Sequence, residues 1–435
     1  MQVQLETLSN LERRMNIALP MAAIETQVAE RLKRVARGAK IQGFRPGKAP
    51  LKIVEMNYGA QVREEVMGEQ VQQGFYKAVT EQSLRVAGYP RFEPVAAGDD
   101  KENFKFAATF EVYPEVKVGE LAGKEIEKPN TEVGDAEIEK TIDILRKQRT
   151  RYNRVERAAA EGDRVIIDFK GAIDGVAFEG GSSENFPFVL GQGQMLAEFE
   201  AGIVGAKEGD IKSVEVNFPE DYHGKDVAGK TAVFEILVKN VAEATLPEVN
   251  EEFAKTLGIA EGDVEKMRGE IRKNVEREVK RRLQARIKEN VMQALIDATE
   301  LELPKALVSL EIGRLVEQAR RDMQQRGMNV KDMPFPPELF AAQAERRVKL
   351  GLILSEMVEA NKLEAKPEQV RAMITEFADS YEQPEDVLSW YYESQDRLEG
   401  PTSMVLEDNV VEFVLSQANV VAKDLSFDEL MGSQA

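Results

Sequence analysis

Two groups of residues in this sequence have types and spacings that could support binding or chemistry: a dense set of aromatic residues and a basic loop. The aromatic residues gather in one stretch, although aromatics make up only 7% of the 435-residue chain. They could enclose an apolar pocket, but composition alone favours a small domain that fills its core with rings. The residues concerned are Phe169, Phe178, Phe186, Phe188, Phe199, Tyr222 and Phe234.

The residue types that the chain lacks exclude several kinds of chemistry. There is no cysteine, which removes disulfides, thiolate catalysis and cysteine-ligated metals. His223 is the only histidine, so there is no histidine cluster for a metal, and a Ser-His-Asp triad is strongly disfavoured. We interpret His223 as an exposed loop residue rather than a catalytic acid. We therefore expect a site without a metal or a cofactor.

The basic loop belongs to a segment, residues 31–52, that contains eight Lys and Arg residues and no acid. A charge run is usually a solvated helix face, yet this one stands out in a chain whose formal net charge is −19. Gly and Pro within the loop enforce an exposed turn, and an aromatic ring lies among the cations. Such a surface suits phosphate groups with an apolar foothold beside them. The loop residues are Gly43, Phe44, Arg45, Pro46, Gly47 and Lys48.

Composition limits the class of protein further. A chain of 435 residues predicts two to four domains, and 43% hydrophobic with 31% charged residues is typical of a soluble protein. Residues 1–112 carry 16 basic and 14 acidic side chains, a net of +2, so the remaining residues carry −21. The formal net charge of −19 argues against general binding to nucleic acid, DNA included, or to anionic membranes. The N-terminus has no signal-peptide pattern and no apolar run suggests a membrane span, so we expect a reducing cytosol.

Hydrophobic periodicity predicts the elements that position these residues. Alternating Met15, Ile17 and Leu19 indicate a strand, followed by helices over about 22–39 and 51–86 and a strand over 104–110. Short alternating segments and one helix near 196–203 indicate a β-rich domain, and almost everything after Pro247 reads as helix. The apolar residues from Val264 to Leu295 are mostly four apart, so their stripe drifts around a long helix, which we expect to pack on different neighbours along its length. Further on, helices over 384–398 and 402–418 are expected, with a break at Gly400-Pro401. The predicted division is 1–112, a small α+β domain; 113–160, a linker with a charged helix; 161–245, the β-rich domain; and 246–435, the helical region.

The order of motifs in residues 161–245 resembles the FKBP family of peptidyl-prolyl isomerases. The sequence runs from Asp168-Phe169 through Phe178-Glu179, Asn185 to Gly191, Phe199 to Gly202 and Phe218 to Tyr222 to Val233-Phe234. The resemblance implies an antiparallel sheet and one helix around a pocket that receives a proline ring. It implies walls and floor made by Phe169, Phe178, Phe188, Leu196, Phe199 and Phe234, a rim with Phe186 and Met195, a Tyr222 hydroxyl for a substrate carbonyl and Glu179 as an acidic neighbour.

The chemistry that the resemblance implies agrees with the missing residue types. Rotation about an X–Pro bond is opposed by amide resonance, with a barrier of about 18–20 kcal/mol. The planar amide is charge-separated, whereas the twisted transition state has lost that resonance. An apolar, dewatered pocket therefore favours the transition state, and each ~1.4 kcal/mol gained is a tenfold increase in rate. No nucleophile, metal or acid–base pair is required.

The loop resembles the ribosome-binding signature of the bacterial trigger factor family, Gly-Phe-Arg-x-Gly-Lys-x-Pro, at every fixed position from Gly43 to Pro50. That family also has an FKBP-like domain and a helical C-terminal region in the order found here. The resemblance implies an α+β multidomain fold: a ribosome-binding domain, a discontinuous all-α chaperone domain and an inserted isomerase domain. It implies docking near the exit tunnel of the large ribosomal subunit, with Phe44, Arg45 and Lys48 on ribosomal protein and RNA.

The same resemblance implies the partners and setting of the protein. Nascent and unfolded polypeptides would be held in an open state, isomerised at X–Pro bonds and assisted in folding and export. The protein would be cytoplasmic and partly ribosome-associated, with a capacity to form a homodimer when free. Nine of the 15 methionines lie in residues 246–435, and Met323, Met328 and Met333 could contact these polypeptides or fill gaps between helices.

Two other functions stay open on the sequence. The chain could be a free isomerase whose helical region only dimerises it. Alternatively, it could be an RNA-binding module with a vestigial isomerase domain. Binding to ribosomes separates the first alternative from a ribosome-associated chaperone, and activity on a proline-containing tetrapeptide separates the second.

Overall fold

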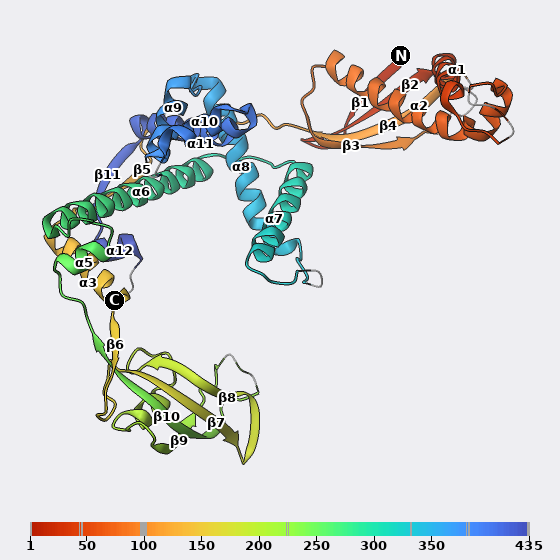
Figure 1. The fold of residues 1–435 in the computed structure, drawn as a ribbon. Coiled ribbons are helices and arrows are strands. Elements are labelled where there is room, and N and C mark those ends of the chain that lie inside the picture. The colour runs from red at the N-terminus through yellow and green to blue at the C-terminus, as the bar shows by residue number, and fades with distance from the viewer. Residues whose placement is uncertain are drawn as a thin grey trace. The chain divides into compact units, whose positions relative to one another are not determined.

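The computed structural model describes residues 2–42, 44, 47–95, 102–222, 224, 226–330, 333–379, 381 and 383–432. The chain divides into two compact units, and both are discontinuous in sequence. One unit contains residues 1–128 and 285–423, and the other contains 129–284 and 424–435 (Figure 1). No helix in the described part of the chain combines the length and apolar character of a membrane span.

The N-terminal part of the first unit is a four-stranded antiparallel sheet with two helices on one face (Figure 1). Alternation buries Met15 and Ile17 of the second strand, and helical spacing buries Ile24 and Val28 of the first helix against them. This confirms the predicted α+β arrangement, in the order β1-β2-β4-β3. The elements are β1 (Gln2–Thr7), β2 (Glu12–Pro20), α1 (Met21–Gly38), α2 (Leu51–Glu81), β3 (Val86–Pro94) and β4 (Asn103–Val112).

The helical part of the first unit is built around two buried clusters. Val291 and Leu295 pack with Ile353, Val410 and other apolar residues in the larger cluster. The sequence placed a helix break at Gly400-Pro401, but one helix runs through both residues and the break lies at Glu393-Ser394 instead. The elements are α7 (Lys305–Gln325), α8 (Glu338–Asn361), α9 (Pro367–Ala378), α10 (Pro384–Tyr392), α11 (Gln395–Gln417) and a two-stranded sheet of β5 (Glu125–Asn130) and β11 (Asn419–Asp424).

The second unit contains a five-stranded antiparallel sheet with one short helix, as predicted for the β-rich domain. The central strand of the sheet pairs with three other strands. The strands that end at Ile173 and begin at Val176 form a hairpin, and its two turn residues, Asp174 and Gly175, both have positive φ. The elements are β6 (Arg151–Arg154), β7 (Arg164–Ile173), β8 (Val176–Val189), α4 (Ala197–Ile203), β9 (Ile211–Asn217) and β10 (Thr231–Thr245).

The segment 113–160 is not a solvated linker throughout. Its charged helix buries Ile138 and Ile142 against Phe253 and Met267, and β6 joins the sheet through β10. This packing could not be predicted from the sequence, because only two isoleucines of that helix are fully buried and the residues around them are charged. The elements outside the sheet in this unit are α3 (Asp135–Gln148), α5 (Glu251–Thr256), the first part of α6 (Val264–Ala298) and α12 (Phe427–Met431).

The long helix α6 packs on different neighbours along its length, as its drifting apolar stripe predicted. Met267, Ile271 and Val275 belong to the core around α3. Val291 and Leu295 belong to the larger cluster of the first unit. One helix therefore contributes to the cores of both units.

Candidate functional site

The structure brings the predicted aromatic residues together on one face of the sheet β7–β10. Phe199 of α4 lies at the centre, with ring centroids 5.2 Å from Phe234, 5.6 Å from Phe169 and 6.3 Å from Phe188. The Phe178 ring is perpendicular to that of Phe234, at 6.1 Å. Edge-to-face contacts of this kind stabilise a fixed arrangement of rings. The cluster is thus an ordered aromatic wall rather than a loose collection of apolar residues.

Burial separates the floor of the cluster from its rim. Phe169, Phe188, Phe199 and Phe234 are each at most 7% exposed. A second group is partly buried and packs around them, so these side chains line the accessible edge. The rim residues are Phe178, Phe186, Met195, Leu196 and Tyr222. The structure therefore gathers these residues in one place, with Phe178 and Leu196, which we expected in the walls and floor, among the partly buried side chains at the edge.

Two glycines allow the rings to pack this closely. A Cβ atom on Gly171 would lie 2.5 Å from the Phe234 ring, and one on Gly181 would lie 2.8 Å from the Phe178 ring. Such distances do not occur between real Cβ atoms and rings. Gly181 lies where four residues of β8 bulge between the Lys170–Ser182 and Ala172–Ala177 pairs. The bulge and its glycine let the Phe178 ring turn over the cluster.

Sequence reasoning did not place Phe218 and Glu200 in the site. The Phe218 ring lies 4.9 Å from that of Tyr222 and 6.1 Å from that of Phe178, and it is 8% exposed. Its alternation with Val214 and Val216 of β9, which ends just before it at Asn217, was a usable signal. Glu200 gave no such signal, because an acidic residue in a short helix is normally exposed.

Glu200 is buried and holds the loop that precedes α4. Its carboxylate accepts hydrogen bonds from the backbone N–H of Gly191 at 2.8 Å and of Met195 at 3.1 Å, and the residue is 8% exposed. Without the Glu200 carboxylate, these two backbone N–H groups at a partly buried site would lose their hydrogen-bond acceptor. Since the loop ends in Met195 and Leu196, Glu200 positions part of the rim.

We expect Glu200→Gln to raise the KM for a proline-containing tetrapeptide about fivefold with little change in kcat. A glutamine oxygen accepts one of the two hydrogen bonds, while its amide group faces the second donor and loses about 1–3 kcal/mol. A looser rim weakens ground-state and transition-state binding alike, which raises KM alone. Glu198→Gln, an exposed change on the same helix, is the control and should match wild type. A fall in kcat at unchanged KM would contradict the positioning role.

An ion pair on the opposite face of the sheet fixes the β-bulge of β8 before Phe186. Lys239 contacts Asp168 at 2.7 Å and donates to the Asn185 side-chain oxygen at 2.9 Å, while the Asn185 N–H donates to Asp168 at 2.6 Å. These hydrogen bonds, that of Lys239 foremost, lower the pKa of Asp168. Asn185 has φ of +53°, a conformation that Asn tolerates well. The network therefore holds the backbone from which Phe186 projects.

The remaining predicted residues of this domain are less enclosed. Glu179 is exposed on β8 beside Phe178, and His223 lies outside the described residues. A cavity of about 450 Å³ lies on the outer face, lined by Asp168, Lys170 and Leu237 among others. Most of its lining residues alternate with the buried rings along the strands, and Phe169 is the one residue of the aromatic cluster in the lining, so that cavity is not the aromatic site. The described residues hold no cluster of three or more acidic or histidine side chains suited to a metal ion.

The basic loop joins α1 and α2 of the first unit. Ile41 and Ala49 on either side of it pack against the core, and the exposed Phe44 donates its N–H to the Ile41 carbonyl at 3.1 Å. Gly47 has φ of +79°, and a Cβ there would lie 3.2 Å from the Arg37 carbonyl oxygen. Gly43, Arg45 and Pro46 lie outside the described residues. The anchored ends place Phe44 and Lys48 beside the C-terminal end of α1.

Comparison with known proteins agrees with this arrangement along the whole chain. The family model of bacterial trigger factor protein (TF) matches residues 1–145, and the model of its C-terminus matches residues 263–416. The model of FKBP-type peptidyl-prolyl cis-trans isomerase matches residues 155–239. A trigger factor of Chromobacterium violaceum is 98% identical over 435 residues, and one of Laribacter hongkongensis is 70% identical, each covering 100% of both chains.

A solved structure is similar in fold. It is described as "Promiscuous Substrate Recognition in Folding and Assembly Activities of the Trigger Factor Chaperone". The TM-score is 0.50 at 17% identity, and the match covers 96% of this chain and 100% of that one.

An aromatic isomerase site set in sequence between an α+β domain and a helical region defines a multidomain chaperone with prolyl isomerase activity. The chain belongs to the bacterial trigger factor family. Its FKBP-type domain is a peptidyl-prolyl isomerase, and membership in the family implies binding to ribosomes and nascent chains. The alternative of a vestigial isomerase domain is therefore not favoured.

Proposed function

We propose that this chaperone docks on the large ribosomal subunit beside the exit tunnel through Gly43, Phe44, Arg45, Pro46, Gly47 and Lys48. There it receives nascent chains in the cytoplasm, keeps them open, isomerises their X–Pro bonds and assists their folding and export. The free protein forms a homodimer and neither the docked nor the free form needs a membrane, DNA or a cofactor. The single observation that carries the docking is a group of exposed, unpaired cations around the loop.

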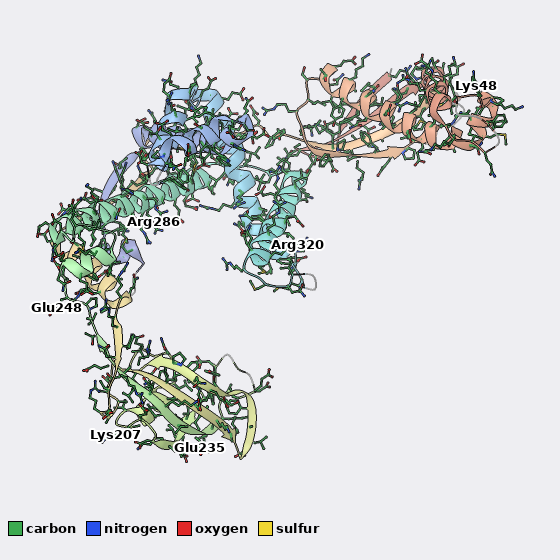
Figure 2. The ribbon with its side chains drawn as sticks, in the orientation of Figure 1. Lys48, Lys207, Glu235, Glu248, Arg286 and Arg320 are labelled. Carbon is green, nitrogen blue, oxygen red and sulfur yellow. The ribbon has the colours of Figure 1, made fainter. Side chains whose placement is uncertain are left out.

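These cations differ from their neighbours in having no acidic partner. Arg31 contacts Glu69 at 2.6 Å and Arg63 contacts Glu25 at 2.6 Å, which neutralises the middle of the helix pair. Beyond Arg31, six cations are exposed, and none forms an ion pair with another described residue. They are Lys33, Arg34, Arg37, Lys40, Lys48 (Figure 2) and Lys52.

Such a surface fits a phosphate backbone better than an acidic protein client. Unpaired cations release bound counterions from RNA, so affinity falls steeply as salt rises. The Phe44 ring, 39% exposed, adds an apolar contact that phosphate alone does not offer. Co-sedimentation with ribosomes over a KCl series tests the docking. The proposal requires binding that weakens with KCl, and a wild-type protein that stays in the supernatant at low salt contradicts it.

The catalytic roles in the isomerase domain are proposed on the geometry of the aromatic cluster. Phe169, Phe178, Phe188, Leu196, Phe199 and Phe234 enclose the proline ring and exclude water, while Glu179 lies outside the apolar wall as its acidic neighbour. Tyr222 at the rim donates its hydroxyl to the substrate carbonyl. The domain limits at residues 112, 160 and 245 stay predictions, although β6 supports an earlier start of the isomerase domain.

We expect Tyr222→Phe to lower kcat/KM for a proline-containing tetrapeptide about fivefold. The substitution removes one hydrogen bond of about 0.5–1.5 kcal/mol and keeps the ring that packs on Phe218. The matched control is Tyr392→Phe, a change of the same kind in the helical region, and it should leave the rate unchanged. Equal rates for Tyr222→Phe and wild type would remove the hydroxyl from the proposed site.

A further inference from the structure

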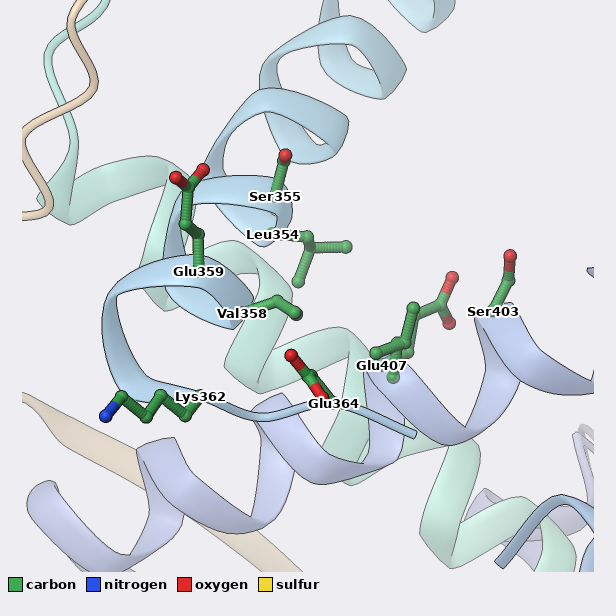
Figure 3. A pocket seen from close by; sticks show the side chains of 9 residues that line it. Leu354, Ser355, Val358, Glu359, Lys362, Glu364, Ser403 and Glu407 are labelled. Atoms are coloured by element: carbon green, nitrogen blue, oxygen red, sulfur yellow. The ribbon is translucent and has the colours of Figure 1, made fainter. Parts of the chain in front are cut away.

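A cavity in the helical part of the first unit has the form of a ligand site. It lies between the C-terminal end of α8 and α11, and its volume of about 560 Å³ is within the range of small-molecule and peptide sites. Figure 3 shows side chains from both helices and from the segment after α8 around it. The lining residues are Leu354, Ser355, Val358, Glu359, Lys362, Glu364, Ser403, Leu406 and Glu407.

One part of the cavity lining is aliphatic. Leu354 and Val358 are partly buried on α8, one turn apart, and they pack against the larger core cluster. Leu406 lies on α11 and is also partly buried. Because these three side chains are anchored in packed helices, the cavity does not depend on a mobile loop for its apolar surface. An occupant with an alkyl segment could cover them from water.

The charged part of the lining is predominantly negative. Glu359 and Glu364 are exposed, and neither carboxylate forms an ion pair with another residue of the described chain. Lys362 extends away from Glu364 and Glu407 in Figure 3, and it forms no ion pair with Glu359 or Glu364 among the described residues. Because these two carboxylates have no cationic partner in the described chain, a cation bound beside the aliphatic surface would be stabilised by them.

Glu407 is the one carboxylate of the lining with a fixed partner. It contacts Lys288 of α6 at 2.8 Å, and Lys288 also contacts Asp408 at 3.1 Å. Burial of Lys288 opposes its charged form, but the two carboxylates outweigh burial and raise the pKa of Lys288. Glu407 is therefore already paired with a cation. Glu359 and Glu364 are the carboxylates of the lining that remain for a cationic ligand.

We propose that this cavity binds a lysine or arginine side chain of an unfolded polypeptide, together with an apolar neighbour. The long alkyl stem of such a side chain would lie along Leu354, Val358 and Leu406, and its charged end would reach Glu359 and Glu364. An anionic ligand would meet unpaired carboxylates, and a purely apolar one would leave them without a partner. The proposal rests on the chaperone function and names one contact site for its clients.

The absence of cysteine from the chain gives a direct test. Ser403→Cys, labelled with an environment-sensitive fluorophore, reports occupancy at the cavity itself. The probe is a ten-residue Leu/Lys peptide without proline, so that the isomerase site does not compete. Its counterpart replaces each Lys by Glu. We expect the cationic peptide to change the fluorescence with saturation and the anionic peptide to have no effect.

The charge contribution is measured with Glu359→Gln/Glu364→Gln in the labelled protein. Loss of two partly exposed charge pairs should weaken the Kd of the cationic peptide about fivefold. The control Glu345→Gln/Glu412→Gln makes the same charge change elsewhere on α8 and α11 and should shift the Kd less than twofold. Equal Kd values for the two double variants, equal binding of both peptides, or binding without a fluorescence change would overturn the proposal.

A separate measurement distinguishes failure of this site from failure of the chaperone function. Suppression of the aggregation of a chemically unfolded protein reports client holding by the whole chain. If wild type suppresses aggregation while the cavity reporter stays silent, the site is wrong and the chaperone function stands. If wild type neither suppresses aggregation nor binds the peptide, client holding itself fails, and the cavity proposal fails with it.

Discussion

Replacing Phe44, Arg45 and Lys48 together by alanine is expected to weaken ribosome binding about a hundredfold at moderate salt. Loss of a partly exposed ring and two cations removes about 2.7 kcal/mol of binding free energy, and every ~1.4 kcal/mol is tenfold. The same variant should flatten the salt dependence, because each phosphate contact contributes about 0.7–0.9 to the slope of log affinity against log salt. Ribosome co-sedimentation over a KCl series measures both effects.

The matched control removes one exposed ring and two exposed cations elsewhere. Tyr392→Ala/Lys207→Ala/Lys212→Ala meets this requirement, since all three side chains are exposed. It should bind ribosomes as wild type does, and both variants should retain the isomerase rate. If the loop variant and wild type sediment equally with ribosomes, the loop does not dock the protein. Equal loss of binding in the control would instead indicate a diffuse electrostatic effect.

Periodicity predicted the regular elements of this fold well, because each one buries a single face. The alternation of Met15 and Ile17 and the four-residue spacing of Ile24 and Val28 lead directly to β2 and α1. The break expected at Gly400-Pro401 was wrong. Pro401 lies inside α11, where its missing N–H removes one backbone hydrogen bond, yet the helix continues because Val405, Val410 and Val414 of the following turns are buried in apolar clusters.

The aromatic site divides in the same way between what sequence could and could not predict. Motif order identified the ring residues, since the family spacing fixes which strands carry them. Glu200 could not be found by that route, because its role depends on two backbone N–H groups, of Gly191 and Met195, that only folding brings to it. The packing of α3 was missed for a similar reason. Two buried isoleucines are a weak signal until the partner surface around Met267 is known.

Phe199→Ala is expected to lower kcat/KM of prolyl isomerisation about a hundredfold. Phe199 is 1% exposed and its ring contacts those of Phe169, Phe188 and Phe234, so its removal opens the floor of the pocket. Water that enters stabilises the charge-separated planar amide more than the twisted transition state. A loss of about 2.7 kcal/mol in differential stabilisation corresponds to the hundredfold decrease. A proline-containing tetrapeptide assay measures it.

Stability needs separate control, because removal of a buried Phe ring costs about 3–5 kcal/mol. Phe199→Leu keeps the site apolar and largely filled, so it should stay folded and retain the rate within about fivefold. Phe75→Ala removes an equally buried ring from the N-terminal core and should leave isomerisation unchanged. Circular dichroism and thermal unfolding show which variants remain folded. A folded Phe199→Ala protein with the wild-type rate would mean that dewatering by this ring does not drive the reaction. A Phe199→Leu protein as inactive as Phe199→Ala would mean that ring shape, rather than apolar volume, is what the proline requires.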